Sequence, residues 1–241
     1  MKTLGIIGGI GPESTIDYYR LLLATYRERM GDGTALSVII NSIDMHKMLG
    51  MIAAGNRPQV TDYLIAELQR LERAGADLAL IAANTPHIVF DEISRRTTIP
   101  LVSIVEAACD AALNLNLSKL GLFGTKFTMQ GKFYAEVFSR KSIALVIPNA
   151  DEQDYIHEKY MTELGNGIFL PETRQKLLAV AQALKTRDQI DGLILAGTEL
   201  PLILRDCNEL GIPVLDTTRI HVQAAIAKLV QKQEAAGTTR P

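Results

Sequence analysis

Two stretches of the chain place polar residues directly after a short apolar run. In the first, Leu78 to Ala83 leads into Asn84-Thr85-Pro86-His87; in the second, Gly192 to Ala196 leads into Gly197-Thr198-Glu199. Apolar runs of this length predict buried parallel strands. Ligands of open α/β sheets bind at the carboxyl ends of such strands. The amide, the hydroxyls and the backbone N–H groups of these two stretches are therefore candidate ligand-binding groups.

A glycine-rich segment, Gly8 to Gly11, follows the predicted first strand at Thr3 to Ile7. Glycines allow the backbone to approach a small ligand, and the N-terminus of the helix that follows favours an anion. The segment matches the dinucleotide-binding fingerprint only loosely, because Ser14 stands near the place of its last glycine. No acidic residue follows the next predicted strand, Ala35 to Ile40, as a ribose ligand should. Nucleotide binding is therefore kept only as a third hypothesis.

The elements between these motifs follow from local signals. We expect a loop that carries His46 and Lys47, a second loop over 50–58, and a helix over 60–74 that ends at Gly75. Apolar residues at helical spacing predict further helices over 106–115 and 219–231. The chain is thus a series of β-α units, which is typical of parallel sheets.

The two halves of the chain resemble each other. Leu4-Gly5-Ile6-Ile7-Gly8 matches Leu120-Gly121-Leu122-Phe123-Gly124, and a tyrosine, Tyr18 or Tyr134, lies ten residues beyond each final glycine. The Asn84-Thr85 and Thr198-Glu199 motifs each precede an Ile-Pro pair, a strand-like piece and an alanine-rich helix. The common order of these matches indicates a duplicated β-α array.

The duplication predicts an α/β fold with two pseudo-symmetric lobes, each with a mostly parallel sheet flanked by helices. We expect residues 1–97 and 216–241 in lobe 1 and residues 101–212 in lobe 2, with a ligand cleft between the lobes. Hydroxyls, an amide and N–H groups at the strand ends suit a carboxylate, which accepts several hydrogen bonds. The alternative is that these residues only cap helices. The substrate-binding candidates are Gly9, Asn84, Thr85, Thr125 and Thr198.

Composition excludes several classes of partner. The chain of 241 residues is 47% hydrophobic and 22% charged, with a net charge of −2, which gives no electrostatic basis for binding nucleic acid or an anionic membrane. No apolar run reaches the roughly 18 residues of a membrane-spanning helix, and the N-terminus leads directly into a strand pattern. We expect a cytoplasmic protein. Its two cysteines, Cys109 and Cys207, lie in apolar helical patterns and indicate buried thiols.

The motifs together resemble the aspartate/glutamate racemase family over essentially the whole chain. The resemblance implies two lobes around a cleft and the racemisation or isomerisation of small carboxylates, with no cofactor, neither pyridoxal phosphate nor metal. Homodimers are common in the family, and the apolar helix over 219–231 is a candidate interface, or it packs on its own lobe. The resemblance rests on Gly8-Gly9 with Glu13-Ser14-Thr15, on Ala83-Asn84-Thr85-Pro86-His87, on Leu122-Phe123-Gly124-Thr125 and on Gly197-Thr198-Glu199-Leu200.

The departure from the family concerns its two catalytic cysteines. The family's pattern places them two residues before the Asn-Thr pair and directly before Thr-Glu, where this chain has Ala82 and Gly197. A racemase needs two opposed acid/base groups, and a thiol suits the role because its pKa of about 8.5 can be tuned toward neutrality. Alanine and glycine cannot transfer protons, and neither Cys109 nor Cys207 lies in a matching motif. Racemisation by two thiols is therefore not expected.

Three hypotheses of function remain. In the first, the chain is an enzyme of this superfamily that uses other groups, with Glu199 and His87 as candidate bases and Thr85 and Thr198 beside them. In the second, it binds an amino acid or dicarboxylate without turnover. In the third, it binds a nucleotide. A simpler interpretation of His87 and Glu199, which we favour, is that they hold the starts of their helices. Candidate cations for a distal carboxylate are Lys47, Lys126 and Lys159.

Overall fold

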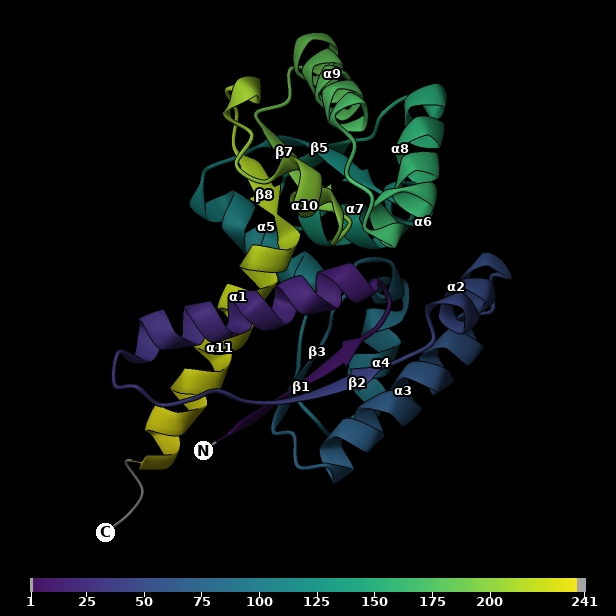
Figure 1. Cartoon of the computed structure of the whole chain (residues 1–241). Coiled ribbons are helices and arrows are strands. Elements are labelled where there is room, and N and C mark those ends of the chain that lie inside the picture. Colours follow the sequence, from purple (N-terminus) through teal and green to yellow (C-terminus); the bar gives the residue numbers. More distant parts are fainter. Residues whose placement is uncertain (1, 238–241) are drawn as a thin grey trace. The chain divides into compact units, whose positions relative to one another are not determined.

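A computed structural model describes residues 2–237 and divides the chain into two compact units (Figure 1). Lobe 1 is Met1–Ser103 with His221–Pro241, and lobe 2 is Ile104–Ile220. The residues 216–220, which the sequence places in lobe 1, belong to lobe 2. They do so because β8 pairs with β7 of that lobe and the start of α11 packs on the same core.

The sheet of lobe 1 has four parallel strands in the order β2-β1-β3-β4. The strands are β1 (Thr3–Gly8), β2 (Ser37–Ser42), β3 (Leu78–Ile81) and β4 (Leu101–Val102). The central strands β1 and β3 are almost completely buried, as expected for strands covered on both faces. The carboxyl ends of all four strands lie at one edge of this sheet.

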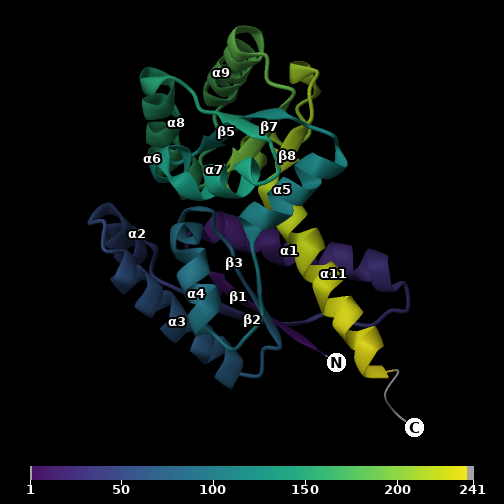
Figure 2. The same cartoon turned by 180° about the vertical axis from the view of Figure 1, so that it is seen from behind.

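Helices cover both faces of the lobe 1 sheet. On one face, α1 (Pro12–Met30) and residues 222–230 of α11 (Thr217–Gly237) pack on Leu4, Ile6 and Leu80. The apolar side of α11 is therefore used within its own lobe. Figures 1 and 2 show α3 (Arg57–Arg73) and α4 (Phe90–Arg96) on the other face.

The segment expected as a loop around His46 and Lys47 is the helix α2 (Met45–Ala53). Asp44 caps it, since its carboxylate accepts a hydrogen bond from the N–H of Lys47 at 3.1 Å. The prediction of a loop was wrong because Gly50 and Gly55 outweighed this capping signal. Only 54–56 separate α2 from α3.

The sheet of lobe 2 repeats the topology of lobe 1, with four parallel strands in the order β6-β5-β7-β8. The strands are β5 (Lys119–Gly124), β6 (Ala144–Val146), β7 (Gly192–Ala196) and β8 (Val214–Asp216). The predicted α/β fold with two similar, parallel-sheet lobes is thus confirmed.

Two cores lie on opposite faces of the lobe 2 sheet. One is formed with α8 (Ala150–Thr162), α9 (Pro171–Asp188) and α10 (Leu200–Leu204), and the other with α5 (Ile104–Asn114) and α7 (Lys132–Ser139). Tyr134 of α7 is completely buried, as is Tyr18 of α1 in lobe 1, so the tyrosine that repeats in the sequence has a core position in both lobes. The remaining short elements are η1 (Thr85–Val89), α6 (Lys126–Gln130), η2 (Leu164–Asn166) and η3 (Asn208–Leu210).

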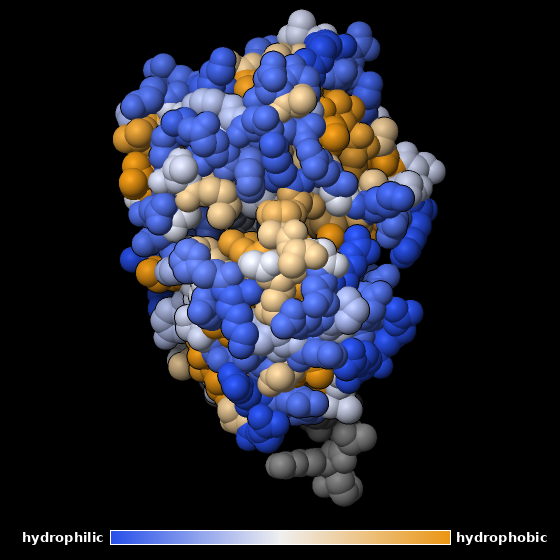
Figure 3. Space-filling view, turned by 90° about the vertical axis from the view of Figure 1, so that its right-hand side faces the viewer, coloured by the Kyte–Doolittle hydropathy of each residue, from blue (hydrophilic) through white to orange (hydrophobic). Residues whose placement is uncertain are grey.

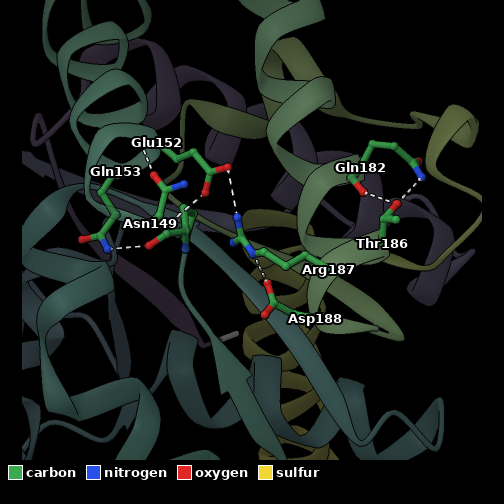
Figure 4. A network of polar contacts seen from close by, with 8 residues as sticks. Asn149, Glu152, Gln153, Gln182, Thr186, Arg187 and Asp188 are labelled. Atoms are coloured by element: carbon green, nitrogen blue, oxygen red, sulfur yellow. Dashed lines mark hydrogen bonds and ion pairs between the residues drawn. The ribbon is translucent and has the colours of Figure 1, made fainter.

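A polar network fixes the start of α8 to the end of α9 (Figure 4). Asn149 and Glu152 form a capping box: the Asn149 side chain accepts from the N–H of Glu152 at 2.9 Å, and the Glu152 carboxylate accepts from the N–H of Asn149 at 2.8 Å. Arg187 of α9 pairs with the same carboxylate at 3.5 Å. The network holds α8 in place, which matters because α8 carries Tyr160, described below.

The surface is mostly polar. The face shown in Figure 3 is largely hydrophilic, with separate apolar patches. Among the described residues, no helix is both long enough and apolar enough to cross a bilayer.

Candidate functional site

In lobe 1, the polar residues after β3 are buried. Asn84 is 3% exposed, Thr85 7% and His87 3%. The carbonyl of Asn84 accepts a hydrogen bond from the N–H of His87 at 3.0 Å, which closes the first turn of η1. The structure therefore brings Asn84 and Thr85 together at the carboxyl end of β3, as the sequence predicts for a strand-end cluster.

The glycine loop after β1 is shaped by close backbone approach. Gly9 has φ of +81°, and a Cβ there would lie 2.5 Å from Oγ of Ser42 and 2.6 Å from the carbonyl oxygen of Ile43. The N–H of Gly9 donates to Oγ1 of Thr15 at 2.9 Å, and this hydroxyl donates to the carbonyl of Gly11 at 3.1 Å. The Gly9 N–H that the sequence offers to a ligand is thus used to close the loop onto α1.

Two buried histidines lie behind the strand ends of lobe 1. Nδ1 of His87 is 2.9 Å from the carbonyl oxygen of Ala83 and must donate to it. Nε2 of His221 likewise donates to the carbonyl of Val102 at 3.0 Å, so its Nδ1 accepts from the hydroxyl of Tyr18 at 2.9 Å. The two rings meet edge to face with centroids 6.1 Å apart.

Burial keeps both imidazoles neutral. It lowers the pKa of His87 to about 3, with His221 adding to the effect, and it lowers the pKa of His221 to about 4. A group with so low a pKa is a weak base near neutral pH. The arrangement favours the interpretation that His87 fixes the turn after β3.

In lobe 2, Thr125 caps the helix that follows β5. Its hydroxyl oxygen accepts from the N–H of Thr128 at 3.3 Å and lies 3.2 Å from the Thr128 hydroxyl. A Cβ at the preceding Gly124 would lie 2.7 Å from the carbonyl oxygen of Ala196, so the ends of β5 and β7 approach closely. At Thr125 the structure shows helix capping, the alternative interpretation of the motif.

The end of β7 carries a cluster of which the sequence predicts only a part. Its members are Gly197, Thr198, Glu199 and Tyr160, the last contributed by α8. The carboxylate of Glu199, 1% exposed, accepts hydrogen bonds on Oε2 from the Tyr160 hydroxyl and, at 3.1 Å, from the Thr198 hydroxyl. Burial, and then the Glu199 charge, raise the pKa of Tyr160 well above its usual value. Local sequence holds no signal for Tyr160, which lies on α8 among other helical residues.

The strand registers show which residue of lobe 1 is equivalent to Gly197 of lobe 2. In lobe 1, Ile7 pairs with Ile81, and in lobe 2 the equivalent Phe123 pairs with Leu195. Counting onward, Ala82 corresponds to Ala196, and Ala83 corresponds to Gly197. Ala82 also continues the core-facing alternation of Leu78 and Leu80 and packs in the lobe 1 core. The counterpart of Gly197 in the repeat is therefore Ala83, one residue beyond the predicted Ala82.

The two cysteines are buried away from these clusters. Cys109 lies on α5 and is 2% exposed; Cys207 is 4% exposed. Cys207 lies just before η3, in the turn after α10, and not inside a helix as expected, because α10 ends at Leu204. Burial raises the pKa of both thiols, which disfavours the reactive thiolate.

The three candidate cations all have neighbours on their own lobes. Lys126 pairs with Asp154, Lys159 pairs with Glu163 at 2.6 Å, and Lys47 lies over the ring of Tyr63 at 4.7 Å. The structure therefore gives each lysine a local contact, and it selects none of them as a ligand for a distal carboxylate.

The fold and the strand-end clusters define a class: a duplicated α/β protein with two four-stranded parallel sheets of the same strand order. The family model described as Asp/Glu/Hydantoin racemase matches residues 7–225. The chain belongs to the Asp/Glu/Hydantoin racemase family, which confirms the resemblance stated above.

Known relatives match almost the whole length of the chain. A candidate Asp/Glu racemase from Yersinia pestis is 30% identical, with a TM-score of 0.85, over 96% of this chain and 100% of that one. An aspartate racemase homologue from Pyrococcus horikoshii OT3 is 33% identical, with a TM-score of 0.81, over 95% and 100%. The broad specificity amino-acid racemase RacX of Bacillus subtilis (strain 168) is 23% identical over 244 residues, 95% of this chain and 99% of RacX.

Proposed function

We propose that this chain binds a small amino acid or dicarboxylate at the carboxyl ends of its parallel strands and does not racemise it with two thiols. Relatives named as amino-acid racemase and aspartate racemase homologue support this class of ligand. The donors proposed for the carboxylate oxygens are the Asn84 amide and the Thr85 hydroxyl at the strand ends of lobe 1, and the Thr125 hydroxyl and the backbone N–H of Thr198 at those of lobe 2. The Thr198 hydroxyl is not among them, because it already donates to Glu199.

The observation that carries the second half of the proposal is the absence of a thiol at the two equivalent strand-end positions, Ala83 and Gly197. The chain's own cysteines do not replace them, because Cys109 and Cys207 are buried in the hydrophobic cores of lobe 2. Alkylation or replacement of both cysteines should therefore leave ligand binding and any turnover unchanged, apart from effects on stability. The cytoplasmic location expected from the sequence stays a prediction.

Calorimetric titration with the D and L forms of aspartate and glutamate tests the ligand. Asn84→Ala should weaken binding of the form that binds by about 1–3 kcal/mol, because a desolvated carboxylate loses a hydrogen-bond donor. Asn114→Ala is the matched control, since Asn114 is exposed at the end of α5, and it should leave the affinity unchanged.

Two results contradict the proposal. One is that none of the four ligands binds; a dinucleotide that raises the melting temperature would then favour the nucleotide hypothesis. The other is that Asn84→Ala, still folded by circular dichroism, binds as tightly as the unmodified chain.

A further inference from the structure

The aromatic ring of Tyr160 occupies the space beside Gly197. A Cβ built at Gly197 would lie 2.4 Å from Cε2 of Tyr160 and 3.2 Å from both Cζ and the phenol oxygen. Atoms this close cannot coexist, so a side chain at 197 would have to displace the ring. The phenol oxygen thus lies in the volume that a longer side chain at 197 would enter.

The hydroxyl of Tyr160 is coupled to a buried carboxylate. It donates to Oε2 of Glu199, and the Thr198 hydroxyl donates to the same oxygen at 3.1 Å. Glu199 is 1% exposed, whereas Tyr160 is only partly buried. Through this hydrogen bond, a proton that reaches the phenol oxygen can be passed to Glu199 and returned.

We propose that Tyr160 and Glu199 form a proton-transferring pair at the position of residue 197, acting on the α-carbon of the bound amino acid. This rests on the proposed function, that an amino acid binds at these strand ends. Lobe 2 alone supplies the whole pair, with Thr198 orienting the carboxylate.

The step balances without any further reagent. The Cα–H bond breaks and its proton moves to the phenol oxygen of Tyr160, while the phenol's own proton moves to Oε2 of Glu199. The electron pair of the broken bond stays on the substrate and spreads into its α-carboxylate. Reversal returns a proton to the same face of Cα. The raised pKa of Tyr160 keeps its proton in place at rest and makes the relay through Glu199 necessary.

The pair takes the proton from one face of Cα and returns a proton to that same face. It should therefore exchange the α-proton with solvent while the configuration at Cα is kept. Exchange without inversion distinguishes this chemistry from racemisation, which needs a second acid/base group.

The experiment incubates the chain with D- and L-aspartate in heavy water and follows deuterium at Cα by NMR, with enantiomer composition measured by chiral chromatography. We expect deuterium in one enantiomer and no conversion to the other. Tyr160→Phe should slow the exchange by about 100-fold or more, the usual size of a general acid–base contribution. Glu199→Gln, which keeps the size of the side chain but cannot take the proton, should slow it similarly.

Tyr155→Phe is the matched control, because Tyr155 also lies on α8 and packs on the same core but is not one of the residues that hydrogen-bond Glu199 above. This variant should exchange the α-proton at the original rate. Calorimetry on each variant separates the two proposals. If the unmodified chain binds neither enantiomer of aspartate or of glutamate, the proposed function fails and this inference fails with it; if it binds only glutamate, the exchange experiment is carried out with glutamate. Binding without deuterium at Cα, or exchange that persists at the original rate in folded Tyr160→Phe or Glu199→Gln, overturns this inference alone.

Discussion

At the scale of single residues, Gly197 shows how one small side chain depends on a distant large one. Its conformation does not need glycine, since its φ lies outside the left-handed region; what excludes a Cβ is the ring of Tyr160. The contact joins residues far apart in the sequence. No periodicity or local motif could therefore predict Tyr160 as part of the candidate site, although Thr198 and Glu199 were predicted from their place after a strand.

Gly197→Ala should destabilise the fold by about 1–3 kcal/mol, because the new methyl overpacks against the Tyr160 ring. In a Tyr160→Leu background, which removes the ring, the same change should cost less, with a coupling of about 0.5–3 kcal/mol between the two sites. Urea unfolding of the unmodified chain, the two single variants and the double variant measures this coupling. Gly50→Ala is the control, since a Cβ at Gly50 meets open space. If the losses in the free energy of unfolding of the two single variants simply add up in the double variant, the steric explanation is contradicted.

At the scale of elements, the strands and their order along the chain were predictable, because short apolar runs bounded by glycine and polar residues are strong local signals. The helix α2 was missed, although Asp44 stood at its N-cap position. The strand register pairs Gly197 with Ala83 in the repeat, whereas the motif pointed to Ala82, and the difference has another cause. A motif in the sequence does not show which face of the strand each residue occupies, and the register with β1 decides it.

The shape of the loop between β1 and α1 depends on how closely the ends of β1 and β2 approach each other. Gly9 and Gly33 both have positive φ, +81° and +79°, but only Gly9 lacks room for a Cβ. Gly33→Ala should cost about 1–2 kcal/mol from backbone strain alone. Gly9→Ala should cost clearly more, since the methyl also meets Ser42 and Ile43. Thermal unfolding of both variants checks this, and equal losses would argue against the close approach of the two strand ends.

At the scale of the whole molecule, the duplication gave both lobes the same sheet but not the same polar interior. Lobe 1 contains His87 and His221, both completely enclosed and both with a lowered pKa, whereas lobe 2 has the less buried His157, whose pKa burial also lowers. The sequence predicted the duplication from matching motifs. It did not predict this asymmetry, because His221 is distant from the motifs and is brought to Tyr18 and Val102 only by α11.

This asymmetry predicts that acid destabilises lobe 1 before lobe 2. A histidine that is neutral when buried takes up a proton in the unfolded chain at its usual pKa of 6.5, so the unfolded state binds more protons as the pH falls. The stabilisation is complete above pH 6.5 and is lost progressively between 6.5 and the folded-state values of about 4 for His221 and about 3 for His87. At pH 5 the loss should be roughly 2 kcal/mol for each histidine.

Hydrogen exchange followed by mass spectrometry at pH 7 and pH 5 should show protection lost first in β1, β3 and α11. His221→Gln should flatten this pH dependence while Tyr18→Phe, which leaves the imidazole buried, should retain it. Earlier loss of protection in lobe 2, or simultaneous loss in both lobes, would show that the two buried histidines do not set the acid sensitivity of the fold.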